Sequence, residues 1–172
     1  MKRWLTRATL LAAIAFPAVN GAAWAGGTDD FGCSNAMLKG EYAFGVIGYT
    51  PPGLPNGPPE VVTGIKVFDG RGNFTQRDYQ GDNLAGPDFA PPGQETGTHQ
   101  VNSDCTGSMV INLNVPSVPP GTSPGVIDIM FVISDGGRHI HEVVSQFTPP
   151  GSSGPAPTQT SADDWKVASD KD

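Results

Sequence analysis

Two histidines, His139 and His141, come nearest to the spacing of a metal site. They stand two positions apart in a stretch that predicts a β-strand, so both side chains lie on one face of it. Such imidazole pairs bind Zn²⁺ when a third ligand approaches. Glu142 faces the other way, so that ligand would have to come from Asp128, His99 or an acidic loop. Because two ligands are only a partial match, we expect a solvated strand face and no metal.

Asp128 interrupts the most apolar stretch of the chain, Val126–Ser134. An unpaired carboxylate is costly to bury, so it either faces outward or is paired inside the fold. The alternate residues Ile127 to Ile133 form the simpler core face, which turns Asp128 outward. If the opposite face lines a barrel, Asp128 becomes an interior acid able to transfer protons. If polar groups converge inside such a barrel, our candidate ligand-binding residues are Tyr42, Asp128 and His141.

Local motifs of known catalytic chemistry are missing from the sequence. It contains no G-x-S-x-G elbow, no H-E-x-x-H pair, no phosphate-binding loop and no dinucleotide fingerprint. The run Asp69-Gly70-Arg71-Gly72-Asn73 lacks the remaining ligands of a calcium loop and predicts a hairpin turn. We assign no catalytic residue and no cofactor, and we lean against an enzyme.

The chain has two cysteines, Cys33 and Cys105. In an exported protein two cysteines predict one disulfide. This bond would close a loop of about 70 residues and stabilise the fold by roughly 3–4 kcal/mol in the chain-entropy model. The alternative is a reactive or metal-binding pair, but no histidine stands at ligand spacing beside either cysteine.

Residues 1–25 have the layout of a bacterial signal peptide. Lys2, Arg3 and Arg7 precede an apolar run at residues 8–19, and Ala23-Trp24-Ala25 resembles a cleavage site. The run is shorter than the roughly 20 apolar residues that cross a membrane. We expect secretion or a periplasmic location after cleavage near Ala25, and no membrane span.

The charge balance excludes one class of partner. Seventeen acidic residues face ten basic ones, for a net charge of −7. Removing the three basic residues of the predicted signal peptide takes this to −10. So negative a chain is repelled by nucleic acid, and we expect no such partner. The sequence predicts no oligomeric state.

Alternating apolar stretches separated by Gly- and Pro-rich loops predict an all-β protein. We expect an antiparallel up-and-down β-barrel of about eight strands, with a β-sandwich as the alternative. The barrel domain would cover residues 26–147, followed by a Pro/Gly/Ser-rich segment at 148–172 that either contains a last strand at 165–168 or is a tail. The seven main strands are predicted at 41–49, 61–69, 73–79, 97–102, 106–115, 126–134 and 138–147.

Four motifs follow one another along the chain. They are C-S-N…L-K-G-E-Y-A-F from Cys33, F-D-G-R-G-N-F from Phe68, G-T…V-N-S-D-C-T-G from Gly97, and D-G-G-R-H-I-H from Asp135. This pattern resembles a group of small exported bacterial β-barrel proteins, similar to the calycin-type barrel of allene oxide cyclase. The resemblance implies the fold and little about activity. His99 stands where the pattern has an aromatic residue, and no cyclase active-site motif can be transferred.

Three functions are compatible with such a barrel. The first is a binding module that holds a small apolar or amphipathic ligand in its mouth. The second is a cyclase- or isomerase-type enzyme. The third is a structural or envelope-interaction protein with a filled barrel. An interior lined by convergent polar groups would favour the first two, and an interior packed with Phe and Ile would favour the third.

Overall fold

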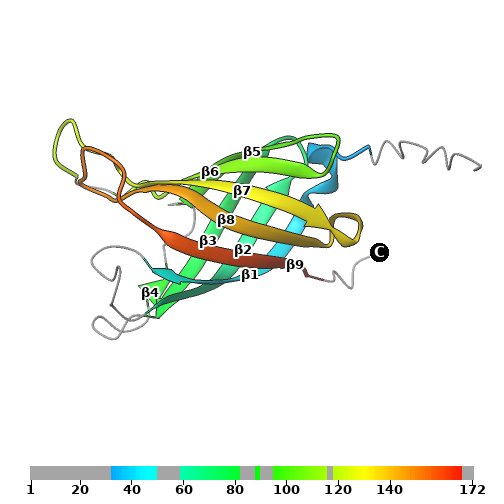
Figure 1. Cartoon of the computed structure of the whole chain (residues 1–172), viewed down its shortest axis with the longest axis horizontal. Helices are drawn as coiled ribbons and strands as arrows, with labels where there is room; N and C mark the ends of the chain where they lie inside the picture. Colours follow the sequence, from blue (N-terminus) through cyan, green and yellow to red (C-terminus); the bar gives the residue numbers. More distant parts are fainter. Residues whose placement is uncertain (1–31, 50–58, 82–87, 90–94, 116–117, 168–172) are drawn as a thin grey trace, which may run out of the picture.

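Eight antiparallel strands form a closed barrel in the computed structural model (Figure 1). The structure describes residues 32–49, 59–81, 88–89, 95–115 and 118–167, so the predicted signal peptide lies outside the described residues. The wall strands are β1 (Lys39–Tyr49), β2 (Glu60–Asp69), β3 (Asn73–Gly81), β5 (Glu95–Val101), β6 (Thr106–Asn112), β7 (Val126–Ser134), β8 (His139–Thr148) and β9 (Gln159–Lys166).

Each wall strand pairs with the next one along the chain, and β9 pairs with both β8 and β1. That last pairing closes the sheet, so the predicted barrel is confirmed and the sandwich alternative is wrong. Closure leaves the wall strands without an open edge. A two-residue strand, β4 (Asp88–Phe89), pairs with the end of β3.

The three largest differences from the sequence prediction concern β9, β4 and β6. The last strand is Gln159–Lys166 and not 165–168, so the barrel extends beyond residue 147. Its sequence, QTSADDWK, is too polar to show strand periodicity, and its strand partners on both sides hold it in place. The short β4 lies in a stretch that predicts a loop, and β6 ends at Asn112 and not at Val115.

The two ends of the barrel differ. At the turn end, short connections join β2 to β3, β5 to β6 and β7 to β8, and the 3₁₀ helix η1 (Asn35–Met37) lies beside β5. At the loop end, the long connections β6–β7 and β8–β9 project together (Figure 1). A single 3₁₀ turn thus separates Cys33 from the first wall strand.

Apolar side chains fill the interior toward the turn end. Leu38, directly after η1, is fully buried there. Phe74 packs over Gly97 and Phe131 over Gly107, where an added Cβ would overlap with the ring. The remaining buried members of this core are Tyr42, Phe68, Met109, Ile111, Ile129, Ile133 and Ile140.

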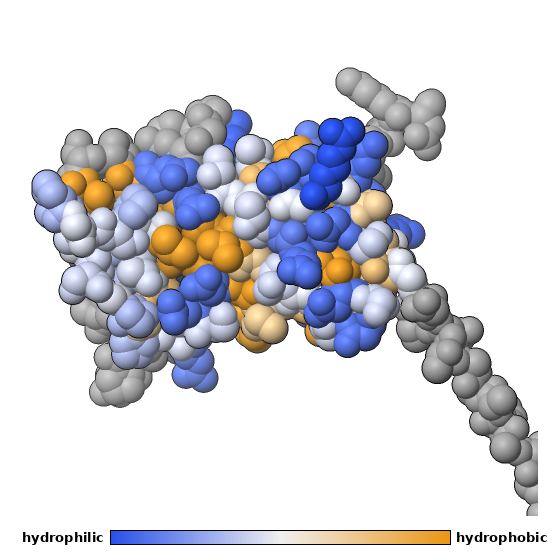
Figure 2. All heavy atoms as spheres, turned by 90° about the horizontal axis from the view of Figure 1, so that it is seen from above, coloured by the Kyte–Doolittle hydropathy of each residue, from blue (hydrophilic) through white to orange (hydrophobic). Residues whose placement is uncertain are grey.

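The outer wall also carries apolar side chains. Figure 2 shows one face of the molecule, where apolar patches lie between polar side chains. Exposed apolar residues on β1 and β2 are Ile47, Val61, Ile65 and Val67, and those on β7, β8 and β9 are Met130, Val132, Val143 and Trp165.

Candidate functional site

Three charged side chains meet inside the barrel, and we call them the ion triad: Lys66, Glu142 and Asp164. Lys66 Nζ donates to both Glu142 carboxylate oxygens at 2.6 and 2.7 Å and to Asp164 Oδ1 at 3.3 Å. All three are at least 96 % buried. Each occupies an inward position of its strand, because Lys66 alternates with Phe68 on β2 and Glu142 with Ile140 on β8.

Two carboxyl groups face one ammonium group in the ion triad. Burial lowers the pKa of Lys66, but attraction to Glu142 and Asp164 and hydrogen bonds with both outweigh it, so its pKa is raised. Burial raises the pKa of Asp164, against the opposing attraction of Lys66. A proton on Asp164 makes the triad neutral, which is the least costly state for buried charges.

A second polar group adjoins the ion triad. Gln76 pairs with Lys66 in the β2–β3 register, and its Nε2 donates to Glu95 at 3.2 Å and to Asp78 at 3.4 Å. Burial, followed by repulsion from Asp78, raises the pKa of Glu95 to about 7. Gln76 Oε1 is buried without a hydrogen-bond partner. This group therefore has unused hydrogen-bonding capacity.

Exposure of the inner wall rises toward the loop end. Lys66 and Phe68 on β2 are buried, whereas the inward positions Val62 and Glu60 on the same strand are half-buried. On β1, Phe44 is buried, Val46 is half-buried, and Gly48 is buried again against Thr160. The polar groups thus lie between the filled turn end and a more accessible loop end.

Tyr42 faces the interior and is fully buried. It lies opposite Lys66 in the β1–β2 register, and its hydroxyl donates to the carbonyl of Gly137. Burial, together with the nearby Asp164 carboxylate, raises the pKa of Tyr42 to about 12. Tyr42 therefore stays protonated and ties the wall to the β7–β8 turn.

Asp128 and His141 lie on the outer wall, so the structure does not bring Tyr42, Asp128 and His141 into one site. Asp128 shares the outward face of β7 with Met130, and its Oδ2 accepts from Gln146 Nε2 at 3.3 Å. This is the outward alternative derived from the sequence. The described interior polar groups include Lys66, Gln76, Asp78, Glu95, His99, Glu142 and Asp164.

The ion triad is not apparent from the sequence. Lys66 stands at the same parity as Phe68 in the β2 alternation, which is the signal of an inward-facing charge. Its partners are 76 and 98 positions away, so their proximity depends on barrel closure. Asp164 belongs to the strand whose position was predicted incorrectly.

His139 and His141 share the outer face of β8, as predicted. Asp163 of β9 lies against both of them, and this residue was not among the proposed third ligands. His99 is instead buried in the interior beside Phe68, near the backbone of Asn35, and neither ring nitrogen makes a hydrogen bond of ordinary geometry. It cannot complete a site on the outer wall.

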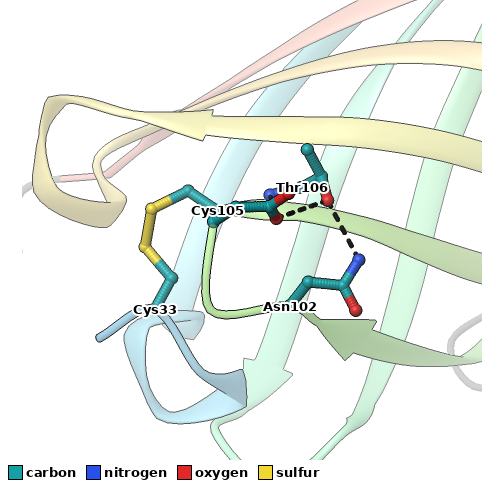
Figure 3. The surroundings of a disulfide bond; sticks show 5 residues. Cys33, Asn102, Cys105 and Thr106 are labelled. Atoms are coloured by element: carbon teal, nitrogen blue, oxygen red, sulfur yellow. Dashed lines mark hydrogen bonds between the residues drawn. A yellow bond between two sulfur atoms is a disulfide. The ribbon is translucent and has the colours of Figure 1, made fainter. Parts of the chain in front are cut away.

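The predicted disulfide joins Cys33 to Cys105 (Figure 3). Their Cα atoms lie 5.1 Å apart, which suits the bond. Cys105 adopts a left-handed backbone (φ 67°) in the β5–β6 turn. Thr106 supports this turn by donating its Oγ1 to Asp104 at 2.6 Å and accepting from Asn102 Nδ2 at 2.9 Å. The bond fastens the segment before η1 to the middle of the chain.

Comparison with known proteins gives no family. No protein-family model matches the chain, and no curated protein matches it. Within the described part of the chain, no helix has the length and apolar character to cross a membrane.

Proposed function

We propose that this protein is a binding module that holds a small amphipathic molecule in the loop half of its barrel. One observation carries the proposal: charged and polar groups are buried beside the half-buried inner wall. Each buried ion costs several kcal/mol after relaxation, and a ligand that contacts these groups would offset part of that cost. Gln76 Oε1 lacks a partner and is available to a ligand.

The interior charge favours a ligand with a basic or hydrogen-bond-donating head. Among the buried and half-buried inward positions that the structure describes, four carboxyl groups adjoin the ammonium group of Lys66. They belong to Asp78, Glu95, Glu142 and Asp164. A protonated amine would compensate this excess, and an apolar tail would contact Val46 and Val62 toward the loop end.

A second function, proton-transfer catalysis, is favoured by Glu95. A carboxyl group whose pKa is about 7 can both donate and accept a proton near neutral pH. This would suit a cyclase- or isomerase-type reaction. The binding module is the better-supported proposal because it requires only the buried polar groups, the unpartnered Gln76 Oε1 and the half-buried wall beside them.

We also propose that the protein works outside the cytoplasm, like the exported barrels it resembles. The disulfide supports this, because such bonds persist in oxidising compartments.

Native mass spectrometry of the protein purified from its own periplasm or medium tests the binding proposal. A bound small molecule, identified after extraction, is the expected result. Thermal shifts with dodecylamine and with lauric acid then compare a basic with an acidic head. We expect stabilisation by the amine that is weakened in Glu95→Gln and kept in the exposed control Glu41→Gln. A clean apo mass together with no shift by either compound would support the filled barrel instead.

A further inference from the structure

We propose that the outer wall of the barrel holds a divalent transition-metal ion, with Nε2 of His139, Nδ1 of His141 and the carboxylate of Asp163 as its ligands. Zn²⁺ is the ion that this set suits best. The site lies on the outward face of β8 and β9, and it is separate from the interior groups that carry the binding proposal.

The three ligand groups already converge. Their ligand atoms all lie within 4.8 Å of one another. Asp163 Oδ1 is 3.2 Å from His139 Nε2 and 2.8 Å from His141 Nδ1. Ligands about 2.0–2.1 Å from a tetrahedral zinc ion are roughly 3.3 Å apart. Small side-chain rotations would therefore replace the present contacts between Asp163 and the two histidines by bonds from all three side chains to one ion.

The backbone fixes this convergence. His139 and His141 are two residues apart on β8, so the pleat places both on the same face. Asp163 is the direct register partner of His141 on the neighbouring strand β9. All three ligands thus stand on paired strands of a closed wall and not on loops, which lowers the ordering cost of binding.

Neighbouring side chains orient both imidazoles. The indole of Trp165 stacks on His139, with ring centroids 4.6 Å apart and planes inclined by 20°. Ser134 Oγ lies 3.3 Å from His141 Nε2, which leaves Nδ1 facing Asp163. A partner on the second ring nitrogen is the usual way a metal-binding histidine is held in one tautomer.

The chemistry of the ligand set selects the ion. Two imidazoles and one carboxylate match Zn²⁺ and the neighbouring late transition metals, whereas Ca²⁺ and Mg²⁺ require mainly oxygen ligands. The side chains of His141 and Asp163 are 53 % and 47 % exposed, so water can reach the fourth position. The alternative is that Asp163 simply accepts hydrogen bonds from two histidines and no ion binds.

Titration of the intact, disulfide-bonded protein with ZnCl₂ tests the site. We expect one Zn²⁺ per chain by calorimetry and by elemental analysis after dialysis, with no uptake of Ca²⁺. His141→Ala and Asp163→Asn should each weaken zinc binding about tenfold or more, as the loss of a site residue commonly does. His99→Phe is the matched control, because it removes a histidine from the interior and should leave the affinity unchanged.

X-ray absorption of the zinc-loaded wild-type protein provides a measurement that needs no variant. The expected spectrum contains two imidazole ligands and no sulfur. Absence of zinc uptake by the wild type, equal affinity in His141→Ala, or a spectrum without imidazole would each overturn the site. None of these results depends on whether the barrel interior binds a ligand.

Discussion

Lys66 and Glu142 form a bidentate contact across the interior, from strands β2 and β8 that are separated in the wall by β1 and β9. Asp164 joins them from β9. The ion triad therefore bridges the seam where the first and last wall strands meet. Its charges pair across this seam and also define the polar interior.

Replacing Lys66 by Met should destabilise the barrel strongly. The change leaves Glu142 and Asp164 buried without a cation, for which a loss of about 3–5 kcal/mol in the free energy of unfolding is typical. Urea denaturation at pH 8 measures the loss, and it should shrink at pH 5, where buried carboxyl groups protonate more readily. The exposed control Lys39→Met should change stability little. Equal effects of the two variants would contradict a stabilising role for the ion triad.

Glu95→Gln should change how stability depends on pH. Because burial raises the pKa of Glu95 from 4.5 to about 7, its contribution to stability is complete below pH 4.5 and is lost as the pH rises toward 7. The glutamine variant lacks this loss, so its stability relative to the wild type should increase from pH 4.5 to pH 7. Chemical denaturation at several pH values checks the slope. The exposed variant Glu41→Gln controls for removal of a charge, and an equal slope in both would refute the assignment.

His99→Phe should stabilise the protein. The imidazole is buried beside Phe68 and Phe74 with neither nitrogen in a hydrogen bond of ordinary geometry, and removing such polar atoms gains about 1 kcal/mol. Burial lowers the pKa of His99, so the wild type loses stability as the pH falls below the ordinary value of 6.5. The variant should lose less stability between pH 7 and pH 5, as thermal unfolding can measure. Lower stability than the wild type at pH 7 would show that the ring nitrogens do have partners.

Removal of the disulfide by Cys33→Ala with Cys105→Ala should cost roughly 3–4 kcal/mol, because the bond closes a loop of 72 residues. Urea denaturation of the oxidised wild type and of the double variant gives the difference. Thiol labelling of the denatured, non-reduced wild type should find no free thiol. Two labelled cysteines would mean that the bond is absent in the purified protein.

The sequence predicts the elements whose apolar residues alternate, and these include β1, β2, β7 and β8. It also predicts the disulfide, because two cysteines in a chain with a signal-like leader leave one pairing. It misplaces β9, whose residues are mostly polar and whose inward Asp164 pairs with Lys66. Strand periodicity is a local signal, and here the local signal is absent.

The limits of a local signal also explain which residues of the candidate sites the sequence does not reveal. The pair His139 and His141 is visible in the sequence because both histidines stand on one strand. Asp163 approaches from the neighbouring strand, so only the β8–β9 register reveals it. The inward parity of Lys66 is visible too, but its two partners meet it only after the sheet has closed.

The seam between β1 and β9 has a consequence for biosynthesis. Tyr42 pairs with Lys166, 124 positions later in the chain. Because the polypeptide is made from its N-terminus onward, seven wall strands are complete before β9 exists. Cys33 can by then already meet Cys105. Until the last strand arrives, the nascent sheet presents two unpaired edges that can recruit other chains. Contacts between such distant residues also form slowly. A product truncated before Gln159 would keep its disulfide and still be prone to aggregation.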